Sequence, residues 1–203
     1  MNFLLKISVA ALLTLNLACS SGDSDYDDQS SSIVSFLEGS HSPTLISYQE
    51  ALSSLDDDPE FYTEFINSSY RYIRDYYNSD RDNKSVVDSK STITITFWLY
   101  DFSSYSSIDE STTVPLYTND ASLKDALIEI GLNTTYWEFE PLKIKLSDGD
   151  SIIIGAREAL IGCKEGDFVE IYMTYNTAYD DTIIGVVGET TPIAMFCQID
   201  SVE

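Results

Sequence analysis

Four segments of the chain alternate apolar with polar residues, and this alternation constrains the fold more than any other feature of the sequence. Side chains that recur with a period of two lie on one face of a β-strand. Strands with one apolar and one polar face predict an antiparallel sheet whose outer face contacts water. The four apolar sets are Ile93, Ile95, Phe97 and Leu99; Leu142, Ile144 and Leu146; Val169, Ile171 and Met173; and Ile193, Met195, Cys197 and Ile199.

Two short helices are expected among these strands. Residues 155–161 are rich in alanine and leucine, and residues 122–130 form a second candidate. A sheet with one apolar face needs another layer to cover that face. The pattern therefore predicts an α+β domain, which we place at residues 86–203.

Residues 31–80 are predicted to form a helical extension in front of this domain. Ile33, Phe36 and Leu37 are spaced as on one face of a helix. Aromatic residues are frequent in the segment 61–77, and we expect that they form part of a core rather than a ligand site. A polar linker would then lead into the first strand.

The first eighteen residues have the layout of an export signal. Lys6 is their only charged residue, and the apolar run 7–17 is shorter than the roughly 20 residues that span a bilayer. The sequence Leu-Ala-Cys that ends at Cys19 resembles the lipobox of bacterial lipoproteins, although Asn16 stands where that motif usually has an aliphatic residue. A signal peptide over residues 1–18 is therefore expected, with a buried N-terminal helix as the alternative.

The resemblance to a lipobox implies that the chain is cut before Cys19 and that this cysteine is lipidated. Two acyl chains give stable membrane anchoring. Residues 19–30 are polar and acidic, which predicts a disordered tether. They also resemble the acidic tag that directs some lipoproteins to the cell surface. We expect an anchored protein outside the cytoplasm, in the outer membrane or at the cell surface.

The charge and the few cysteine and histidine residues exclude several classes of function. A formal net charge of −23 argues against a nucleic-acid partner, because phosphates are bound by lysine and arginine. With His41 as the single histidine, a zinc site or a histidine-dependent triad is not expected. Cys163 and Cys197 are expected to be buried thiols, and a disulfide between them stays possible outside the cytoplasm.

Beyond these patterns, the second half of the chain resembles the FKBP-type peptidyl-prolyl cis-trans isomerases in the order and spacing of several motifs. From Ile152 onward these are an aliphatic pair, a helix start led by Gly155, a turn that contains Tyr179, and a final alternating strand. Upstream, residues 93–97 are similar to a strand of the family, and residues 100–140 are longer than in compact members. The resemblance implies a curved antiparallel sheet wrapped around a short helix, without a cofactor or metal.

The resemblance also implies a site and a reaction. Rotation about a bond that precedes proline crosses a barrier of about 20 kcal/mol, and a dry apolar pocket lowers it by binding the twisted amide better than the planar one. By position, the catalytic residues are Tyr179, Ile153 and Phe97, with the Tyr179 hydroxyl and the Ile153 backbone N–H donating to a peptide carbonyl. Proline-containing peptides or proteins are the expected partners. The other substrate-binding positions are Leu142, Ala156, Val187, Met195 and Tyr117.

Several residues depart from the family pattern. Ala156 stands where the family has the tryptophan that floors the pocket, Phe97 lacks a phenol, and Tyr117 replaces an aspartate. We therefore expect an open pocket floor and an isomerase or folding helper whose activity is weak or lost. The alternatives are a non-catalytic peptide- or protein-binding lipoprotein on the same scaffold, a purely structural surface lipoprotein, and an unrelated α+β domain.

Overall fold

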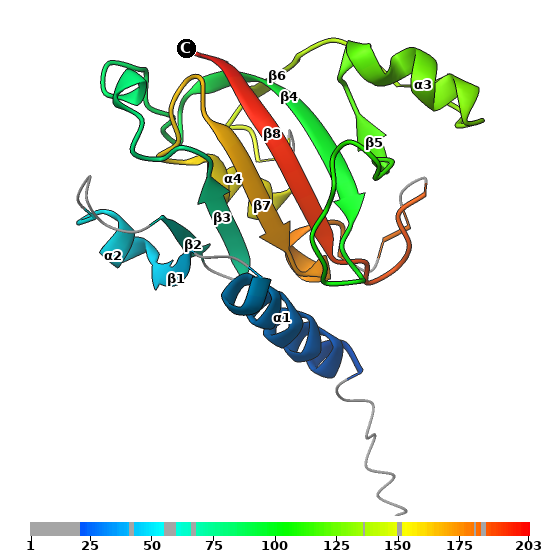
Figure 1. The fold of residues 1–203 in the computed structure, drawn as a ribbon, viewed down its shortest axis with the longest axis horizontal. Coiled ribbons are helices and arrows are strands. Elements are labelled where there is room, and N and C mark those ends of the chain that lie inside the picture. The colour runs from blue at the N-terminus through cyan, green and yellow to red at the C-terminus, as the bar shows by residue number, and fades with distance from the viewer. Residues whose placement is uncertain are drawn as a thin grey trace, which may run out of the picture.

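The chain folds around one curved sheet, which Figure 1 shows in a computed structural model. The structure describes residues 21–40, 43–54, 60–65, 68–135, 137–149, 152–180, 182–183 and 186–203. Over these residues the sheet has eight strands in the order β1-β2-β3-β7-β8-β4-β5, with β6 also paired to β4. The strands are β1 (Thr44–Ser47), β2 (Phe61–Phe65), β3 (Ser69–Ile73), β4 (Thr92–Asp101), β5 (Tyr117–Thr118), β6 (Leu142–Lys145), β7 (Phe168–Met173) and β8 (Ile193–Val202).

The helices are short apart from the first one. They are α1 (Ser21–Ser40), α2 (Tyr48–Ala51), α3 (Lys124–Glu129) and α4 (Ile154–Leu160). Single turns of 3-10 helix lie at Ser79–Arg81, Ala121–Leu123 and Tyr175–Thr177. The α+β class, the four alternating strands and both expected short helices are confirmed.

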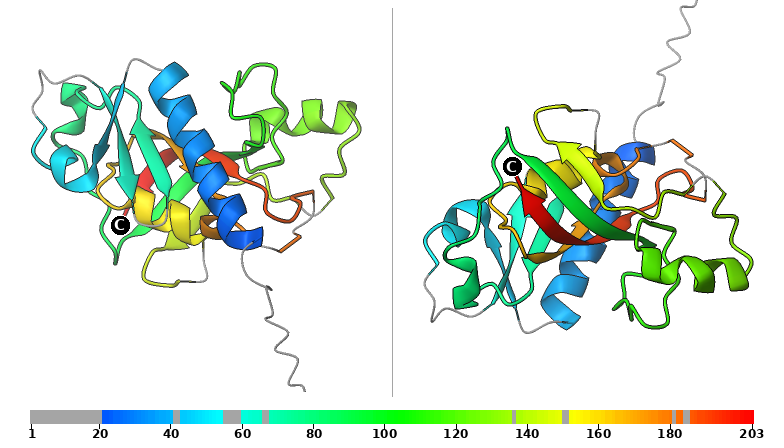
Figure 2. Two further views of the ribbon diagram at one scale, coloured as in Figure 1. Left: turned by 90° about the horizontal axis from the view of Figure 1, so that it is seen from below. Right: turned by 90° about the horizontal axis from the view of Figure 1, so that it is seen from above.

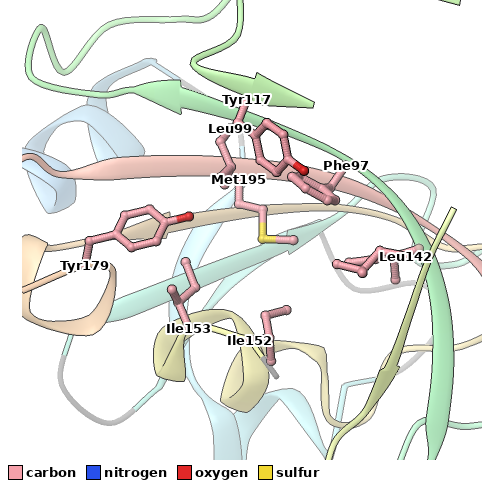
Figure 3. Close-up of a pocket in the computed structure, with 9 residues that line it drawn as sticks. Phe97, Leu99, Tyr117, Leu142, Ile152, Ile153, Tyr179 and Met195 are labelled. Carbon is pink, nitrogen blue, oxygen red and sulfur yellow. The ribbon is translucent and has the colours of Figure 1, made fainter. Parts of the chain in front are cut away.

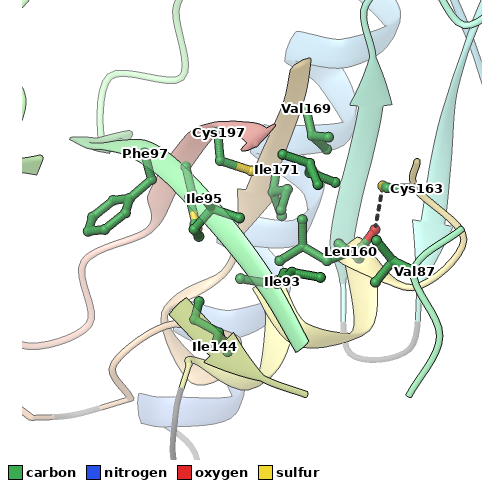
Figure 4. Close-up of a cluster of buried hydrophobic side chains, with 14 of the residues drawn as sticks. Val87, Ile93, Ile95, Phe97, Ile144, Leu160, Cys163, Val169, Ile171 and Cys197 are labelled. Carbon is green, nitrogen blue, oxygen red and sulfur yellow. Dashed lines mark hydrogen bonds between the residues drawn. The ribbon is translucent and has the colours of Figure 1, made fainter. Parts of the chain in front are cut away.

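One face of the sheet is covered by α4, and the main hydrophobic core lies between them (Figure 4). The alternating residues of β4, β7 and β8 point into this core, and Leu160 of α4 is fully buried among them. Cys163 and Cys197 are buried free thiols in the same core, and the Cys163 thiol donates to the Ala159 carbonyl at 3.6 Å. Burial raises the pKa of the Cys163 thiol to about 11, so it stays protonated at neutral pH.

The face of the sheet opposite α4 is buried at its centre. The expectation that this face would be polar and in contact with water is therefore wrong. Helix α1 packs against it (Figure 2), and Ile33, Phe36 and Leu37 are buried as their helical spacing predicted. Their partners are large residues of the outer faces of β3, β4, β7 and β8. Tyr172 and Phe196 alternate with the inner set, so β7 and β8 carry buried apolar residues on both faces. This second core contains Tyr62, Tyr70, Tyr100, Phe102, Tyr172, Ala194 and Phe196.

The N-terminal predictions are wrong in two respects. Residues 21–30, expected to be a disordered tether, belong to α1, because its apolar face and Gln29 pack on the sheet. The expected helical extension 31–80 is helical only at its start and in short turns. Its aromatic segment forms β2 and β3, which alternate large side chains between two faces, and β3 pairs with β7 across the proposed boundary at residue 86.

One edge of the sheet and the N-terminal region differ from the remaining fold. Strands β1 and β2 pair in parallel, so the sheet is mixed rather than purely antiparallel. Within the described ranges, no helix combines the length and hydropathy that crossing a membrane requires. The proposed signal peptide, Cys19 and His41 lie outside the described residues.

Candidate functional site

An apolar cavity of about 270 Å³ opens between the inner face of the sheet and the start of α4 (Figure 3). Six of the eight pocket residues expected from the sequence line it. Phe97 and Met195 come from β4 and β8, Leu142 from β6 and Tyr117 from β5, while Ile153 and Tyr179 come from loops. The remaining lining residues are Ile95, Leu99 and Ile152.

The aromatic wall of the cavity is held by a buried side chain that bridges two segments. The Asn119 carboxamide accepts a hydrogen bond from the Phe97 backbone N–H at 2.7 Å and donates to the carbonyls of Ile95 and Glu140 at 2.9 Å each. It thereby fixes β4 to the segment that leads into β6. The rings of Phe97 and Tyr117 then meet edge to face with centroids 5.4 Å apart.

Tyr179 projects from the turn that follows β7, and its hydroxyl points toward Met195 in the cavity (Figure 3). The turn closes through a 2.8 Å hydrogen bond from the Asp180 N–H to the Tyr175 carbonyl. Burial, with a smaller contribution from Tyr117, raises the pKa of Tyr179 above its ordinary value. The phenol therefore stays protonated at neutral pH and can donate a hydrogen bond.

Gly155 allows the start of α4 to approach the turn that carries Tyr179. A Cβ atom at this position would lie 2.6 Å from the Ser69 hydroxyl oxygen and 2.9 Å from the Thr177 carbonyl oxygen. No side chain fits at such distances, so glycine is required for this contact. The close approach places Ile152 and Ile153, just before α4, at the lower wall of the cavity (Figure 3).

Two expected pocket residues do not line this cavity. Ala156 is fully buried within the main core, where α4 packs on the sheet. The expectation that it leaves the pocket floor open to water is therefore wrong, because the helix packs closely enough to enclose this position. Val187 instead lines a second cavity of about 590 Å³, which shares Leu99, Tyr117 and Tyr179 with the first.

Sequence reasoning missed most of the second cavity. Trp137 lines it, and its ring meets Tyr117 edge to face at 5.1 Å. The segment that supplies this wall has no periodic pattern and aligned poorly with the family, so no signal pointed to it. By contrast, Leu99 and Ile95 share the period of Phe97 and could have been found. The residues not expected at this cavity are Val114, Pro115, Leu132, Asn133, Trp137 and Val186, besides Leu99.

The first cavity provides an apolar surface and hydrogen-bonding hydroxyls, and its lining has no acid–base or nucleophilic side chain of the usual kinds. The lining of the first cavity contains no carboxylate, amine, imidazole or thiol, and its polar side-chain atoms are the hydroxyls of Tyr117 and Tyr179. Among the described residues, no three histidine, cysteine, aspartate or glutamate side chains gather as metal ligands would. The chemistry within reach is the burial of an apolar group beside a phenolic donor.

Comparisons with known proteins identify similar folds but no similar sequence. Neither a protein-family model nor a curated protein sequence matches this chain. A structure of the three FKBP domains of wheat FKBP73 matches with a TM-score of 0.50 and 11% sequence identity. The match covers 71% of this chain and 51% of the wheat chain, so this chain spans about half of that protein's length.

Two bacterial structures are also similar. The structure of FkpA from Escherichia coli has a TM-score of 0.45 and 12% identity, and the match covers 89% of this chain and 63% of that one. The structure of a peptidyl-prolyl cis-trans isomerase from Pseudomonas syringae pv. tomato has a TM-score of 0.49 and 10% identity. That match covers 91% of this chain and 98% of the bacterial one.

Proposed function

We propose that this chain, which has an FKBP-like fold, binds proline-containing segments of other proteins in the first cavity and acts as a folding helper with weak peptidyl-prolyl isomerase activity. The observation that carries this proposal is the convergence of Phe97, Ile153, Tyr179 and Met195 on one open apolar cavity. These residues come from four separated parts of the chain, and the fold brings them together.

The size and lining of the cavity suit a prolyl side chain. Cavities for drug-sized ligands range from about 300 to 1,000 Å³, and this one is slightly smaller at about 270 Å³. It therefore suits a single apolar side chain from a longer segment. The protonated Tyr179 hydroxyl at its wall is placed to donate to a carbonyl oxygen of the bound backbone.

Weak turnover follows from what the cavity lacks. Isomerisation is accelerated only by interactions that are stronger with the twisted amide than with the planar one. Tyr117 occupies the position of the family's aspartate, and a neutral phenol is a weaker electrostatic partner than a carboxylate. Met195 is an unbranched, flexible side chain, which holds a proline ring in one position less firmly than a rigid aromatic ring does. Both differences reduce discrimination between the two amide geometries while leaving apolar binding in place.

Steady-state isomerisation of a proline tetrapeptide, combined with calorimetric titration of the same peptide, tests this function. We expect measurable binding that Tyr179→Phe weakens modestly and Ile153→Asp abolishes, with turnover far below that of an FKBP-type enzyme with a complete aromatic pocket. Ile130→Asp, at an exposed residue of the chain that lines neither cavity, is the matched control and should bind normally. Turnover at the level of such an enzyme would refute weak catalysis, and the absence of binding would refute the function.

We also propose that the chain is attached to a membrane by a lipid on Cys19. The lipobox-like sequence that ends at Cys19 supports cleavage and lipidation there, two residues before α1 begins. The folded domain would then lie close to the membrane surface. Cys19→Ala should lose the acyl mass and leave the membrane fraction, whereas Cys163→Ala should remain attached. A Cys19→Ala protein that stays membrane-bound after carbonate washing would contradict lipid anchoring.

A further inference from the structure

A third cavity lies beside the C-terminal end of α4. Its volume is about 360 Å³, and it shares no lining residue with the two cavities described above. Its walls come from α2, β2 and the end of α4, near the edge of the sheet opposite β5 (Figure 1). The lining residues are Tyr48, Gln49, Glu64, Phe65, Glu158 and Ile161.

Two aromatic rings form the apolar wall of the third cavity. A capping box between Ser47 and Glu50 starts α2 directly after β1. The helix start places Tyr48 against Phe65 of β2, with ring centroids 5.3 Å apart. The guanidinium of the buried Arg71 lies 4.8 Å from the centroid of the same Phe65 ring. The Phe65 ring therefore already contacts a cation, which aromatic rings attract.

The polar wall carries two carboxylates, Glu64 and Glu158, and no basic residue lines the cavity. Glu64 forms no ion pair with any residue that the structure describes. Glu158 pairs with Arg157 at 3.2 Å, and its side chain is 44% exposed. Such an exposed pair contributes little free energy, so a ligand can compete for the carboxylate. Aromatic rings beside two carboxylates match a side chain with an apolar stem and a cationic head.

We propose that the third cavity binds a basic side chain of a protein partner, and that it prefers arginine to lysine. Arginine offers five donors and a planar face for stacking on a ring, whereas lysine offers a compact point charge. A side chain within a protein is favoured over the free amino acid, because the two glutamates would repel a free α-carboxylate. The site does not depend on the proposed function, and a partner bound here leaves the first two cavities accessible.

Titration of the full chain with N-acetyl-arginine N-methylamide tests the proposal. Carbon-13 labels at the isoleucine δ methyl groups report on Ile161 in the third cavity and on Ile153 in the first. The Ile161 signal should shift with a dissociation constant on the order of 1 mM, as expected for so small a ligand. The Ile153 signal should stay in place.

Three further ligands examine the chemistry without any change to the protein. The citrulline analogue has nearly the same shape but no charge, and it should bind about tenfold more weakly. The lysine analogue should bind about threefold more weakly, because its ammonium cannot stack as a guanidinium does. Free arginine should also bind about threefold more weakly than the blocked analogue.

Variants assign the binding to this cavity. Glu64→Gln and Glu158→Gln should each weaken the arginine analogue about threefold to tenfold, and Tyr48→Leu should weaken it about threefold. Arg157→Gln should strengthen binding about twofold, because it frees Glu158 from its internal partner. Glu129→Gln makes the same change of charge at an exposed residue of α3 that lines none of the three cavities, and it should alter nothing.

The contrary results are distinct. Equal binding of the arginine and citrulline analogues would overturn the proposal. A loss in Glu129→Gln as large as that in Glu64→Gln would assign the effect to the overall charge of the chain and contradict a site at this cavity. Tighter binding of the lysine analogue would refute the preference for arginine, and tighter binding of free arginine would refute a protein partner. A proline peptide should shift Ile153 and leave Ile161 in place, so the proposed function is tested separately.

Discussion

The side-chain oxygen of Gln29 in α1 accepts a 2.9 Å hydrogen bond from the backbone N–H of Tyr175, which lies 146 residues later in the chain. The amide nitrogen of the same side chain donates to the Thr190 carbonyl at 2.7 Å. Gln29 is only 8% exposed. It thus holds both ends of the segment that carries Tyr179 and Val187, so a residue of the stretch expected to be a disordered tether supports the candidate site.

Gln29→Ala should therefore weaken both the fold and the site. Losing a side chain that pairs one buried and one half-buried backbone group costs about 1–3 kcal/mol of unfolding free energy. Hydrogen exchange should rise in residues 175–180 and 187–191, and proline-peptide affinity should fall. Ser31→Ala, at an exposed position of the same helix, serves as the control. Unchanged exchange in the segment would show that Gln29 does not hold it.

Arg71 holds the C-terminal end of α4. It is 5% exposed, and its guanidinium donates to the carbonyls of Ala159 and Ile161 at 2.7 and 2.8 Å, where the helix ends. Carbonyl groups at a helix end need such partners when they are buried.

Arg71→Met should therefore lower the unfolding free energy by about 2–4 kcal/mol, since a buried and a half-buried carbonyl lose their donor. Arg157→Met removes a more exposed arginine that pairs with the neighbouring Glu158, and it should cost less than about 1 kcal/mol. Chemical denaturation of the two variants gives the comparison. Similar losses in both would contradict a capping role for Arg71.

Several features of this arrangement could be predicted from the sequence. The period of two located β4, β7 and β8, because those strands place one apolar set in a single core. The helical spacing of Ile33, Phe36 and Leu37 identified the buried face of α1. The resemblance to the FKBP-type isomerases predicted eight pocket residues, and six of them line the first cavity.

The remaining features depend on contacts between distant segments. Tyr70 and Tyr72 lie in the extension that was expected to be helical, yet they belong to β3. This strand pairs with β7, and pairing between segments about a hundred residues apart overrides local preference. The acidic composition around Gln29 predicted disorder. The segment is helical because α1 packs on the aromatic residues of the outer face of the sheet, and composition alone does not reveal such a contact. Trp137 enters the site from an irregular segment, for which no periodic signal exists.

Ala156→Trp should not restore catalysis. The methyl group is fully enclosed by the main core, so an indole would overpack it and cost about 3 kcal/mol or more. Thermal unfolding should show the loss, and turnover of a proline tetrapeptide should not rise. Ala126→Trp, at an exposed position of α3, should leave stability nearly unchanged. A stable Ala156→Trp protein with raised turnover would show that the core has room for this ring.

Stability should fall at alkaline pH through the buried tyrosines. Burial is the main cause that raises the pKa of Tyr100 to about 12, whereas the phenol in the unfolded chain titrates near 10. The raised pKa contributes stability below about pH 10, and this contribution is lost as the pH rises toward about 12. The loss from Tyr100 approaches about 2–3 kcal/mol. Denaturation at about pH 8 and about pH 11 should show a smaller loss in Tyr100→Phe; an equal loss in both proteins would exclude this cause.

The methionine methyl groups test directly whether the first cavity receives proline. Met195 lines the cavity, whereas Met173 is fully buried in the same core and does not. In a protein labelled with carbon-13 at its methionine methyl groups, a proline peptide should shift the Met195 signal in proportion to occupancy and leave the Met173 signal in place. A peptide with alanine in place of proline should shift Met195 far less. If the Met195 signal stays fixed at millimolar peptide, or both peptides move it equally, the cavity is not a proline site.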